Sequence, residues 1–284
     1  MRAIGANTWI WASPITDETI AAVAPRVAEL GFDFMELPVE EQGAWDPVRV
    51  TELLSDLGLG ASVCCVMPPG RDLAISDDAA VEATQYYLRY CVDVAQRVGS
   101  GVVAGPMYAA VGRLWRTDDA ERRATIERVA TGLRPVAEHA AERGVKLAVE
   151  PLNRYETSLI NTVDQGLELV ESVGHDAVGL LLDTFHMNIE EKDTGAAIAR
   201  AGDRVLHFHT CENDRGAPGS GGVRWDEVFG ALAAIGYDRM LVIEAFTPEI
   251  EEIARAVSTW RPVADSPDVL ARDGLGFLRE RLAA

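Results

Sequence analysis

A short hydrophobic run recurs eight times along the chain, and this repetition limits which folds are possible. Successive runs begin about 25 to 45 residues apart and are rich in apolar, β-branched and aromatic residues. They are nearly continuous in hydrophobicity, as parallel strands buried on both faces are. The eight expected strands cover residues 3–11, 33–39, 60–67, 101–108, 146–153, 178–185, 204–211 and 239–246.

Between these runs the hydrophobic period becomes helical. Apolar residues recur every three or four positions, and a helix end is marked by Gly31, whereas a helix start is marked by the capping-box spacing of Thr162 and Gln165. Pro25 and Pro135 fall inside such stripes and predict kinks. The stripes are Ile20, Val23, Val27 and Leu30, then Ile126, Val129, Leu133 and Val136, then Val163, Leu167 and Val170.

Alternation of eight strands with helices favours a (β/α)8 TIM barrel, in the α/β class. An open doubly wound sheet alternates in the same way, but it usually carries an early glycine-rich phosphate turn, and neither G-x-G-x-x-G nor G-x-x-x-x-G-K occurs. No linker or low-complexity segment divides the chain. We therefore expect one barrel domain over residues 1–284, with a C-terminal helical extension at about 266–283.

Composition excludes several classes of partner. The formal charge is −19, from 26 basic and 45 acidic residues, and no Lys/Arg cluster suits a nucleic-acid backbone. No apolar run approaches the roughly 20 residues of a membrane span, and the N-terminus lacks a signal-peptide layout, so a cytoplasmic protein is expected. The four cysteines form no Cys-x-x-Cys pair, which argues against a disulfide framework or a thiolate zinc site.

Four consecutive expected strands end in a residue that can bind a metal: Glu150, Asp183, His209 and Glu244. One acid at a strand end is usually a helix cap, but four in succession favour a shared site. Adjacent strands lie about 4.8 Å apart, and three carboxylates crowded together cannot all stay ionised without a cation. Three oxygen ligands and one imidazole suit Mn²⁺, Co²⁺ or Mg²⁺, with Zn²⁺ as an alternative.

Two further features lie near the seventh strand. His207 shares a strand face with His209, and we interpret it as a packed core histidine. The glycine-rich segment 214–225 reads either as a flexible loop or, because it follows a barrel strand, as part of the active-site face.

Several motifs resemble those of the ketose 3-epimerases, which comprise the D-tagatose, D-allulose (psicose) and L-ribulose enzymes of the xylose-isomerase-like barrel superfamily. The motifs are VEPLNRYET, LLLDTFHMNIEE, HFHTCENDRGAPGSG and VIEAF. The resemblance is strong over residues 146–261 and extends to STWRPV at 258–263. Over residues 1–110 it is looser and rests on patterns such as ELGFDFMEL.

The resemblance implies a site and a reaction. One divalent cation, Mn²⁺ first with Co²⁺ or Mg²⁺ as alternatives, is held by the four strand-end residues. Glu150 and Glu244 exchange protons on opposite faces of C3 of a free ketose, through a metal-stabilised cis-enediolate. The sugar near C1 and C2 is bound by Glu156, His186 and Arg215. A homodimer or homotetramer is expected.

The chain also departs from the family pattern. Cys211 replaces a glycine, Asn213–Asp214 is altered, and Met67 stands where a smaller residue is common, all at positions where the substrate is expected. Trp115 and Phe246 are candidates for an apolar wall against the far end of the sugar.

Other functions remain to be weighed. A phosphorylated substrate would use the glycines and Arg215, but the acidic end of the eighth strand and the net charge favour a free sugar. An aldose–ketose isomerase, or an enzyme that acts on 3-keto glycosides by elimination, would use similar chemistry. A DNA-repair endonuclease with three zinc ions needs early histidines, and none occurs in the first 138 residues. A non-catalytic sugar-binding barrel would lack a ligand or a base.

Overall fold

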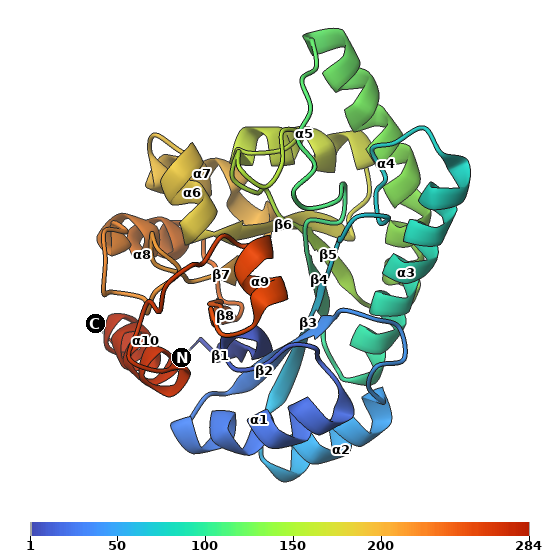
Figure 1. Ribbon diagram of the computed structural model, residues 1–284. Helices are drawn as coiled ribbons and strands as arrows, with labels where there is room; N and C mark the ends of the chain where they lie inside the picture. Colours follow the sequence, from blue (N-terminus) through green and yellow to red (C-terminus); the bar gives the residue numbers. More distant parts are fainter. Residues whose placement is uncertain (1, 284) are drawn as a thin grey trace.

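The computed structural model describes residues 2–283, apart from the side chains at positions 252, 253 and 256. Eight parallel strands form a closed barrel in chain order, in which β1 pairs with both β2 and β8 (Figure 1). The strands are β1 (Ile4–Asn7), β2 (Phe34–Val39), β3 (Gly60–Cys65), β4 (Val102–Gly105), β5 (Lys146–Val149), β6 (Val178–Asp183), β7 (Val205–His209) and β8 (Leu241–Ile243). The predicted (β/α)8 barrel is confirmed.

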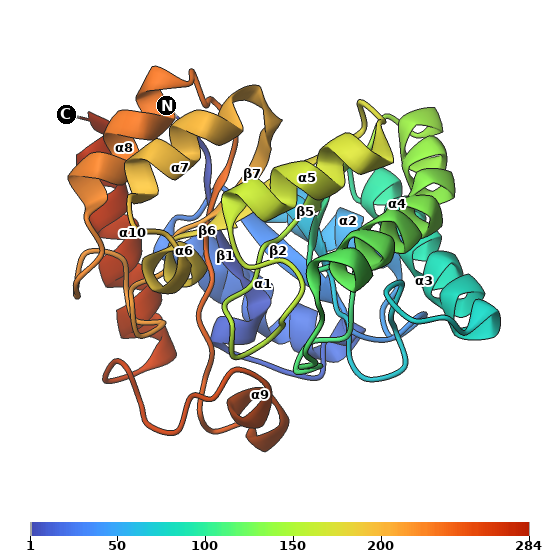
Figure 2. The same ribbon diagram turned by 90° about the horizontal axis from the view of Figure 1, so that it is seen from above.

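Helices follow each strand and surround the barrel, while α9 lies beyond the carboxyl ends of the strands (Figure 2). They are α1 (Asp17–Leu30), α2 (Pro47–Asp56), α3 (Asp78–Arg97), α4 (Asp119–Glu142), α5 (Val163–Val173), α6 (Thr184–Glu190), α7 (Thr194–Ala201), α8 (Trp225–Ala234), α9 (Glu251–Ala256) and α10 (Pro267–Ala283), with 3-10 turns at Thr8–Ile10 and Gly202–Arg204. Helix α10 contacts α1, β1 and β8 and completes the outer ring.

Seven of the eight strands end earlier than the hydrophobic runs that predicted them, and β2 ends with its run at Val39. The first run extends to residue 11, but β1 ends at Asn7, whose side chain accepts a hydrogen bond from the Trp9 amide and starts a 3-10 turn. Likewise β6 ends at Asp183, which caps α6 by accepting from the Phe185 amide at 2.8 Å. Polar side chains at the strand ends thus draw the backbone out of the sheet and begin the loops.

The helix end at Gly31 and the helix start at Thr162, both predicted from the sequence, are confirmed. Gly31 ends α1 in the left-handed conformation, with φ of 93°, and Thr162 with Gln165 forms the capping box of α5. Pro25 and Pro135 lie inside α1 and α4, which continue past them. Each proline removes one backbone hydrogen bond, and burial of the helix's apolar stripe against the barrel compensates for it.

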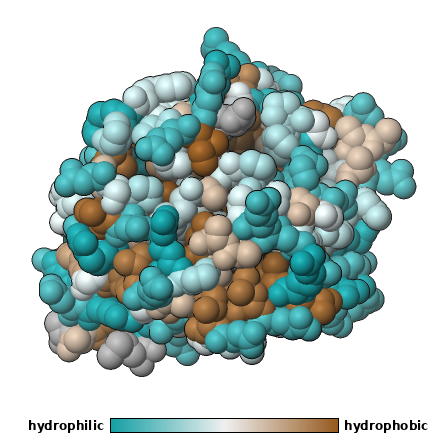
Figure 3. All heavy atoms as spheres, turned by 60° about the horizontal axis from the view of Figure 1, so that its bottom comes forward, coloured by the Kyte–Doolittle hydropathy of each residue, from teal (hydrophilic) through white to brown (hydrophobic). Residues whose placement is uncertain are grey.

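The core has two layers. The larger one fills the space between strands and helices, and a smaller cluster packs separately, formed by Cys64, Val102, Ala104, Ala148 and Leu181. Ala148 and Leu181 share a strand face with Glu150 and Asp183, so these apolar side chains lie below the polar residues at the carboxyl ends. On the face that carries α1 and α2, hydrophilic residues surround a more hydrophobic middle (Figure 3). No helix in the described part of the chain is long and apolar enough to cross a bilayer.

Candidate active site

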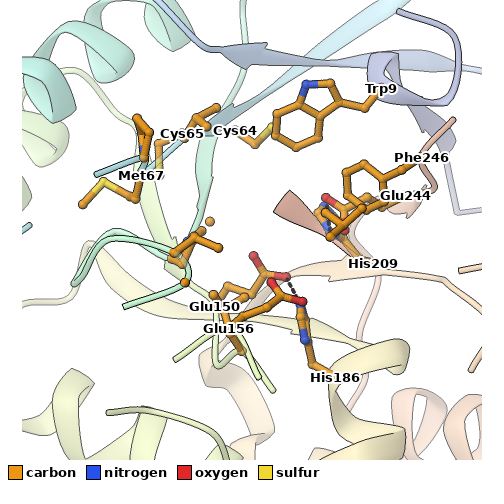
Figure 4. Close-up of a pocket in the computed structure, with 18 of the residues that line it drawn as sticks. Trp9, Cys64, Cys65, Met67, Glu150, Glu156, His186, His209, Glu244 and Phe246 are labelled. Atoms are coloured by element: carbon orange, nitrogen blue, oxygen red, sulfur yellow. Dashed lines mark ion pairs between the residues drawn. The ribbon is translucent and has the colours of Figure 1, made fainter. Parts of the chain in front are cut away.

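A cavity of about 330 Å³ opens at the carboxyl ends of the strands. Carboxylates and imidazoles form one part of its wall, and Trp9, Cys64, Cys65, Met67 and Phe246 form another (Figure 4). Residues Arg255 and Val257, at and just after α9, line its mouth.

The four predicted metal ligands converge in this cavity. Glu150 follows β5, Asp183 and His209 are the last residues of β6 and β7 and pair in register, and Glu244 follows β8. One ligand atom from each of the four lies within 4.8 Å of the other three, and all four residues are buried. The barrel therefore gathers in one place residues that are up to 94 positions apart in the sequence.

The arrangement fits a divalent cation. Glu150 Oε1 and His209 Nδ1 are buried without a hydrogen-bond partner among the described residues, which is costly unless another group satisfies them. Burial and the charge of Glu244 raise the pKa of Glu150 well above its usual range. Burial likewise raises the pKa of Asp183, against the opposing effect of Arg215. Such crowded carboxylates are a typical environment for a hard metal ion.

Arg215 lies closer to the four residues than its place in the loop after β7 suggests. Its Nη1 donates to Asp183 Oδ2 and to Glu244 Oε2, both at 2.7 Å, and its guanidinium stacks on Phe185 at 4.0 Å. Burial opposes the charge on Arg215, but these two carboxylates raise its pKa well above the usual value. Burial raises the pKa of Glu244 too, but His209 and then Arg215 outweigh it and leave that pKa lowered. Arg215 is therefore a fixed positive charge inside the site.

His186 projects into the cavity from α6, one turn after Asp183. Its Nδ1 accepts a hydrogen bond from the Asn153 backbone amide at 3.0 Å, and its Nε2 lies 3.2 Å from Arg215 Nη2 and 3.6 Å from Glu150 Oε1. Burial, followed by the charges of Arg215 and His209, lowers the pKa of His186 well below its usual value. His186 thus presents a neutral imidazole to the cavity.

Glu156 completes the set of predicted sugar-binding residues in the cavity wall. Its Oε1 accepts a hydrogen bond from Asn153 Nδ2 at 2.7 Å, and burial raises its pKa. Six of the seven predicted metal-binding and sugar-binding residues therefore line one cavity, and the seventh, Asp183, contacts Arg215 and lies within 4.8 Å of the other proposed ligands.

Of the two residues predicted to form an apolar wall, one lies at the cavity. Phe246 lines the cavity, but Trp115 does not: it packs under the guanidinium of Arg113 at 3.9 Å, in a separate surface depression. Trp9 takes the place expected of Trp115, with its ring 5.7 Å from that of Phe246. Trp9 reaches the cavity because the 3-10 turn at Thr8–Ile10 turns the chain directly after β1.

Sequence reasoning missed Glu36, in the middle of β2. His207 is buried as predicted, and it is also hydrogen-bonded, because its Nε2 lies 3.0 Å from Glu36 Oε2. The other oxygen of Glu36 lies 2.8 Å from His209 Nε2. The available signal was an acid inside the hydrophobic run FMELPV, where a buried strand has little use for a charge.

The glycine-rich segment after β7 is folded around one buried carboxylate, that of Glu212. Glu212 Oε1 accepts from the Gly219 amide at 2.9 Å and from Trp225 Nε1 at 2.7 Å. Glu212 Oε2 accepts from the amides of Asn213 and Val223, both at 3.1 Å. This segment also carries Arg215 in the left-handed conformation, with φ of 67°.

The residues that depart from the family pattern differ in whether they line the cavity. Met67 lines the cavity, as expected. Cys211 does not: its Sγ lies 2.7 Å from the backbone oxygen of Glu244, so it packs behind the site. Asp214 points outward to Arg261, at 3.2 Å. Of these changes, only Met67 meets the space where a substrate would lie.

Comparison with known proteins places this geometry in a family. The chain matches the family described as xylose isomerase-like TIM barrel over residues 24–281. A probable ketose 3-epimerase of Synechocystis sp. is 36% identical to it, over 97% of this chain and 95% of the relative. The solved structure of an L-ribulose 3-epimerase superposes with a TM-score of 0.93 at 32% identity, covering 100% of this chain and 95% of the other.

A D-allulose 3-epimerase from Methylomonas sp., solved in complex with D-allulose, superposes with a TM-score of 0.92 at 28% identity, covering 99% of this chain and 97% of the other. The two superpositions cover at least 99% of this chain. The chain therefore belongs to the xylose isomerase-like TIM barrel family and, within it, to the ketose 3-epimerases, which are isomerases acting on carbohydrates.

Proposed function

We propose that this enzyme epimerises a free ketose at C3 and that Glu150, Asp183, His209 and Glu244 hold one divalent cation. The observation that carries the proposal is the convergence of these four buried side chains within 4.8 Å, where two of their atoms have no hydrogen-bond partner in the part of the chain that the structure describes. Three carboxylates and one imidazole suit Mn²⁺ first, with Co²⁺ or Mg²⁺ as alternatives. When bound, the cation supplies Lewis-acid polarisation of the C2 ketone, which acidifies the neighbouring C3 proton.

Glu150 and Glu244 are the proposed acid–base pair. They follow β5 and β8, which are separated in the barrel by β6 and β7, and they approach the cavity from different sides (Figure 4). One glutamate, as the carboxylate, takes the proton from C3, and the other, in its protonated form, gives a proton to the opposite face, which inverts that carbon. Each such transfer contributes about 10²- to 10⁴-fold in rate.

The remaining polar residues hold the sugar. The Arg215 guanidinium and the His186 imidazole bind the C1–C2 oxygens, where negative charge develops, and Glu156 accepts from a hydroxyl. His186 is held in place by Asn153, and Arg215 is held by Asp183 and Glu244, so little reorganisation is needed during the reaction. Trp9 and Phe246 supply an apolar surface beside them.

A free sugar is favoured over a sugar phosphate. Among the cavity-lining residues the permanent cations are Arg215, which is paired with two carboxylates, and Arg255, which is paired with Glu251 at 2.5 Å. A dianionic phosphate would have to compete with these acids for each guanidinium. The related D-allulose 3-epimerase, whose structure holds the unphosphorylated sugar D-allulose, supports the same choice.

The test is incubation with Mn²⁺ and a panel of ketoses in D₂O. We expect deuterium at C3 and a mixture of C3 epimers, whereas deuterium at C1 or C2 with an aldose product would show an aldose–ketose isomerase instead. The value of kcat/KM is then compared between a free ketohexose or ketopentose and its terminal phosphate. A tenfold or greater preference for the phosphate would overturn the assignment of a free sugar.

A further inference from the structure

Beneath the cavity lies a buried carboxylate that the reaction described above does not use. Glu36, in β2, is 0% exposed, and its side chain crosses the barrel interior to β7. Its Oε1 lies 2.8 Å from His209 Nε2, and its Oε2 lies 3.0 Å from His207 Nε2. Asn7 Nδ2 adds a longer contact to Oε1 at 3.5 Å. Both oxygens are therefore engaged, and two histidines share one acid.

This arrangement fixes which nitrogen of each ring carries hydrogen. An ionised carboxylate can only accept hydrogen bonds, so each imidazole presents Nε2–H to Glu36. In the neutral ring of His209 the lone pair is then on Nδ1. That nitrogen lies 3.5 Å from Glu244 Oε1 and has no hydrogen-bond partner among the described residues. Glu36 thus leaves free the nitrogen of His209 that faces the other three proposed ligands.

The three residues Glu36, His207 and His209 also have ligand atoms within 4.8 Å of one another. Two imidazole N–H groups at 2.8 and 3.0 Å from one carboxylate already form a complete pair of charge-assisted hydrogen bonds. The His207 ring further meets the His209 ring edge-on, with centroids 5.3 Å apart. We interpret the group as a hydrogen-bonded support for His209 rather than as a second cation site.

We propose that Glu36 is a positioning residue, which holds His209 in the tautomer and ring orientation that a divalent cation requires. The inference rests on the proposed cation site. A carboxylate that accepts from the far nitrogen of a ligating imidazole raises its basicity and fixes its ring, and loss of such a partner typically weakens metal affinity about 10- to 100-fold.

The test uses Glu36→Gln, which keeps the shape of the side chain and removes its charge. The amide oxygen can still accept from His209, but the amide nitrogen then has to donate to His207, whose tautomer must reverse. We expect the Mn²⁺ dissociation constant, measured by electron paramagnetic resonance, to rise about 10- to 100-fold. The value of kcat at saturating Mn²⁺ should fall less than the affinity does.

The matched control is His207→Gln, which disturbs the same carboxylate from its other side and leaves the contact to His209 in place. We expect its Mn²⁺ dissociation constant to stay within threefold of the wild-type value. An affinity of Glu36→Gln within twofold of wild type, or equal losses in the two variants, would overturn the positioning role. Absence of Mn²⁺ binding by the wild-type protein would overturn the proposed cation site itself, and the inference with it.

A measurement on the unmodified protein covers the case in which Glu36→Gln does not fold. In the Mg²⁺-loaded enzyme, ¹⁵N spectra of the histidine side chains should show hydrogen on Nε2 of His209 and none on Nδ1. Hydrogen on Nδ1 of His209 would overturn the proposal whatever the variants do.

Discussion

Replacing Glu212 by glutamine tests whether one buried carboxylate organises the loop that carries Arg215. The carboxylate accepts four hydrogen bonds, two on each oxygen. A glutamine keeps one acceptor oxygen and turns the other into a donor that faces two N–H groups. Whichever way the amide is turned, two hydrogen bonds are lost and the other two lose their charge.

The size of the effect follows from these four contacts. A hydrogen bond to a charged group contributes about 1.5–3 kcal/mol, but three of the four donors lie in partly exposed segments and can turn to water, so we expect a total loss of about 2–4 kcal/mol. At about 2–4 °C per kcal/mol for a domain of this size, Tm should fall by about 5–15 °C.

The same change should reduce activity, because the turn that holds Arg215 in its left-handed conformation begins at Glu212, whose backbone oxygen accepts from the Arg215 amide at 3.0 Å. We expect kcat/KM for the best ketose to fall at least tenfold, a loss of about 1.4 kcal/mol in transition-state stabilisation. Calorimetry and an epimerisation assay by chromatography measure the two effects.

The control is Asp226→Asn, the same chemical change on the neighbouring helix α8. The side chain of Asp226 is 84% exposed and pairs with Arg281 at the surface, where an ion pair is worth about 0–1 kcal/mol. If Glu212→Gln has the same Tm and the same kcat/KM as this control, the carboxylate does not hold the loop and the reasoning is wrong.

Three further predictions concern the cavity. Chelation of the divalent cation should abolish turnover and lower Tm, because a ligand of the folded state stabilises it by mass action; an unchanged Tm and turnover would count against the site. Asp183→Asn should lose metal and activity together. Arg215→Ala should lower kcat/KM but retain its metal in elemental analysis, because it removes a competing cation from two of the carboxylates. Equal metal loss in both variants would contradict this separation of roles. Met67→Ala should enlarge the cavity and raise the ratio of kcat/KM for ketohexoses to kcat/KM for ketopentoses at least threefold, with a loss of about 2–5 kcal/mol in stability. The control Cys211→Ala, behind the site, should leave that ratio unchanged.

The parts of the site that the sequence predicts are those with a local signal. Glu150, Asp183, His209 and Glu244 each follow a hydrophobic run directly, and parallel strands in a barrel bring their carboxyl ends to one face. Thr162 and Gln165 predict a helix start for the same reason, since a capping box is complete within four residues.

The parts that the sequence does not predict depend on contacts across the barrel. Glu36 meets its partner His209 at a separation of 173 residues, and only closure of the sheet brings β2 and β7 to opposite sides of one narrow interior. Similarly, Trp9 lines the cavity only because β1 ends at Asn7. If the strand continued by one more residue, the indole of Trp9 would point to the opposite face of the sheet. Strand ends are set by competing hydrogen bonds and not by hydrophobicity.

The position of Arg215 bears on how the enzyme is assembled in the cell. Its guanidinium lies between Asp183 and Glu244 and offsets their mutual repulsion, so the chain carries its own internal counter-ion. We therefore expect the barrel to fold before it encounters a metal, and the ion to load into a finished cavity. Since divalent ions compete for such sites largely through their availability, the metal recovered from cells should follow the growth medium.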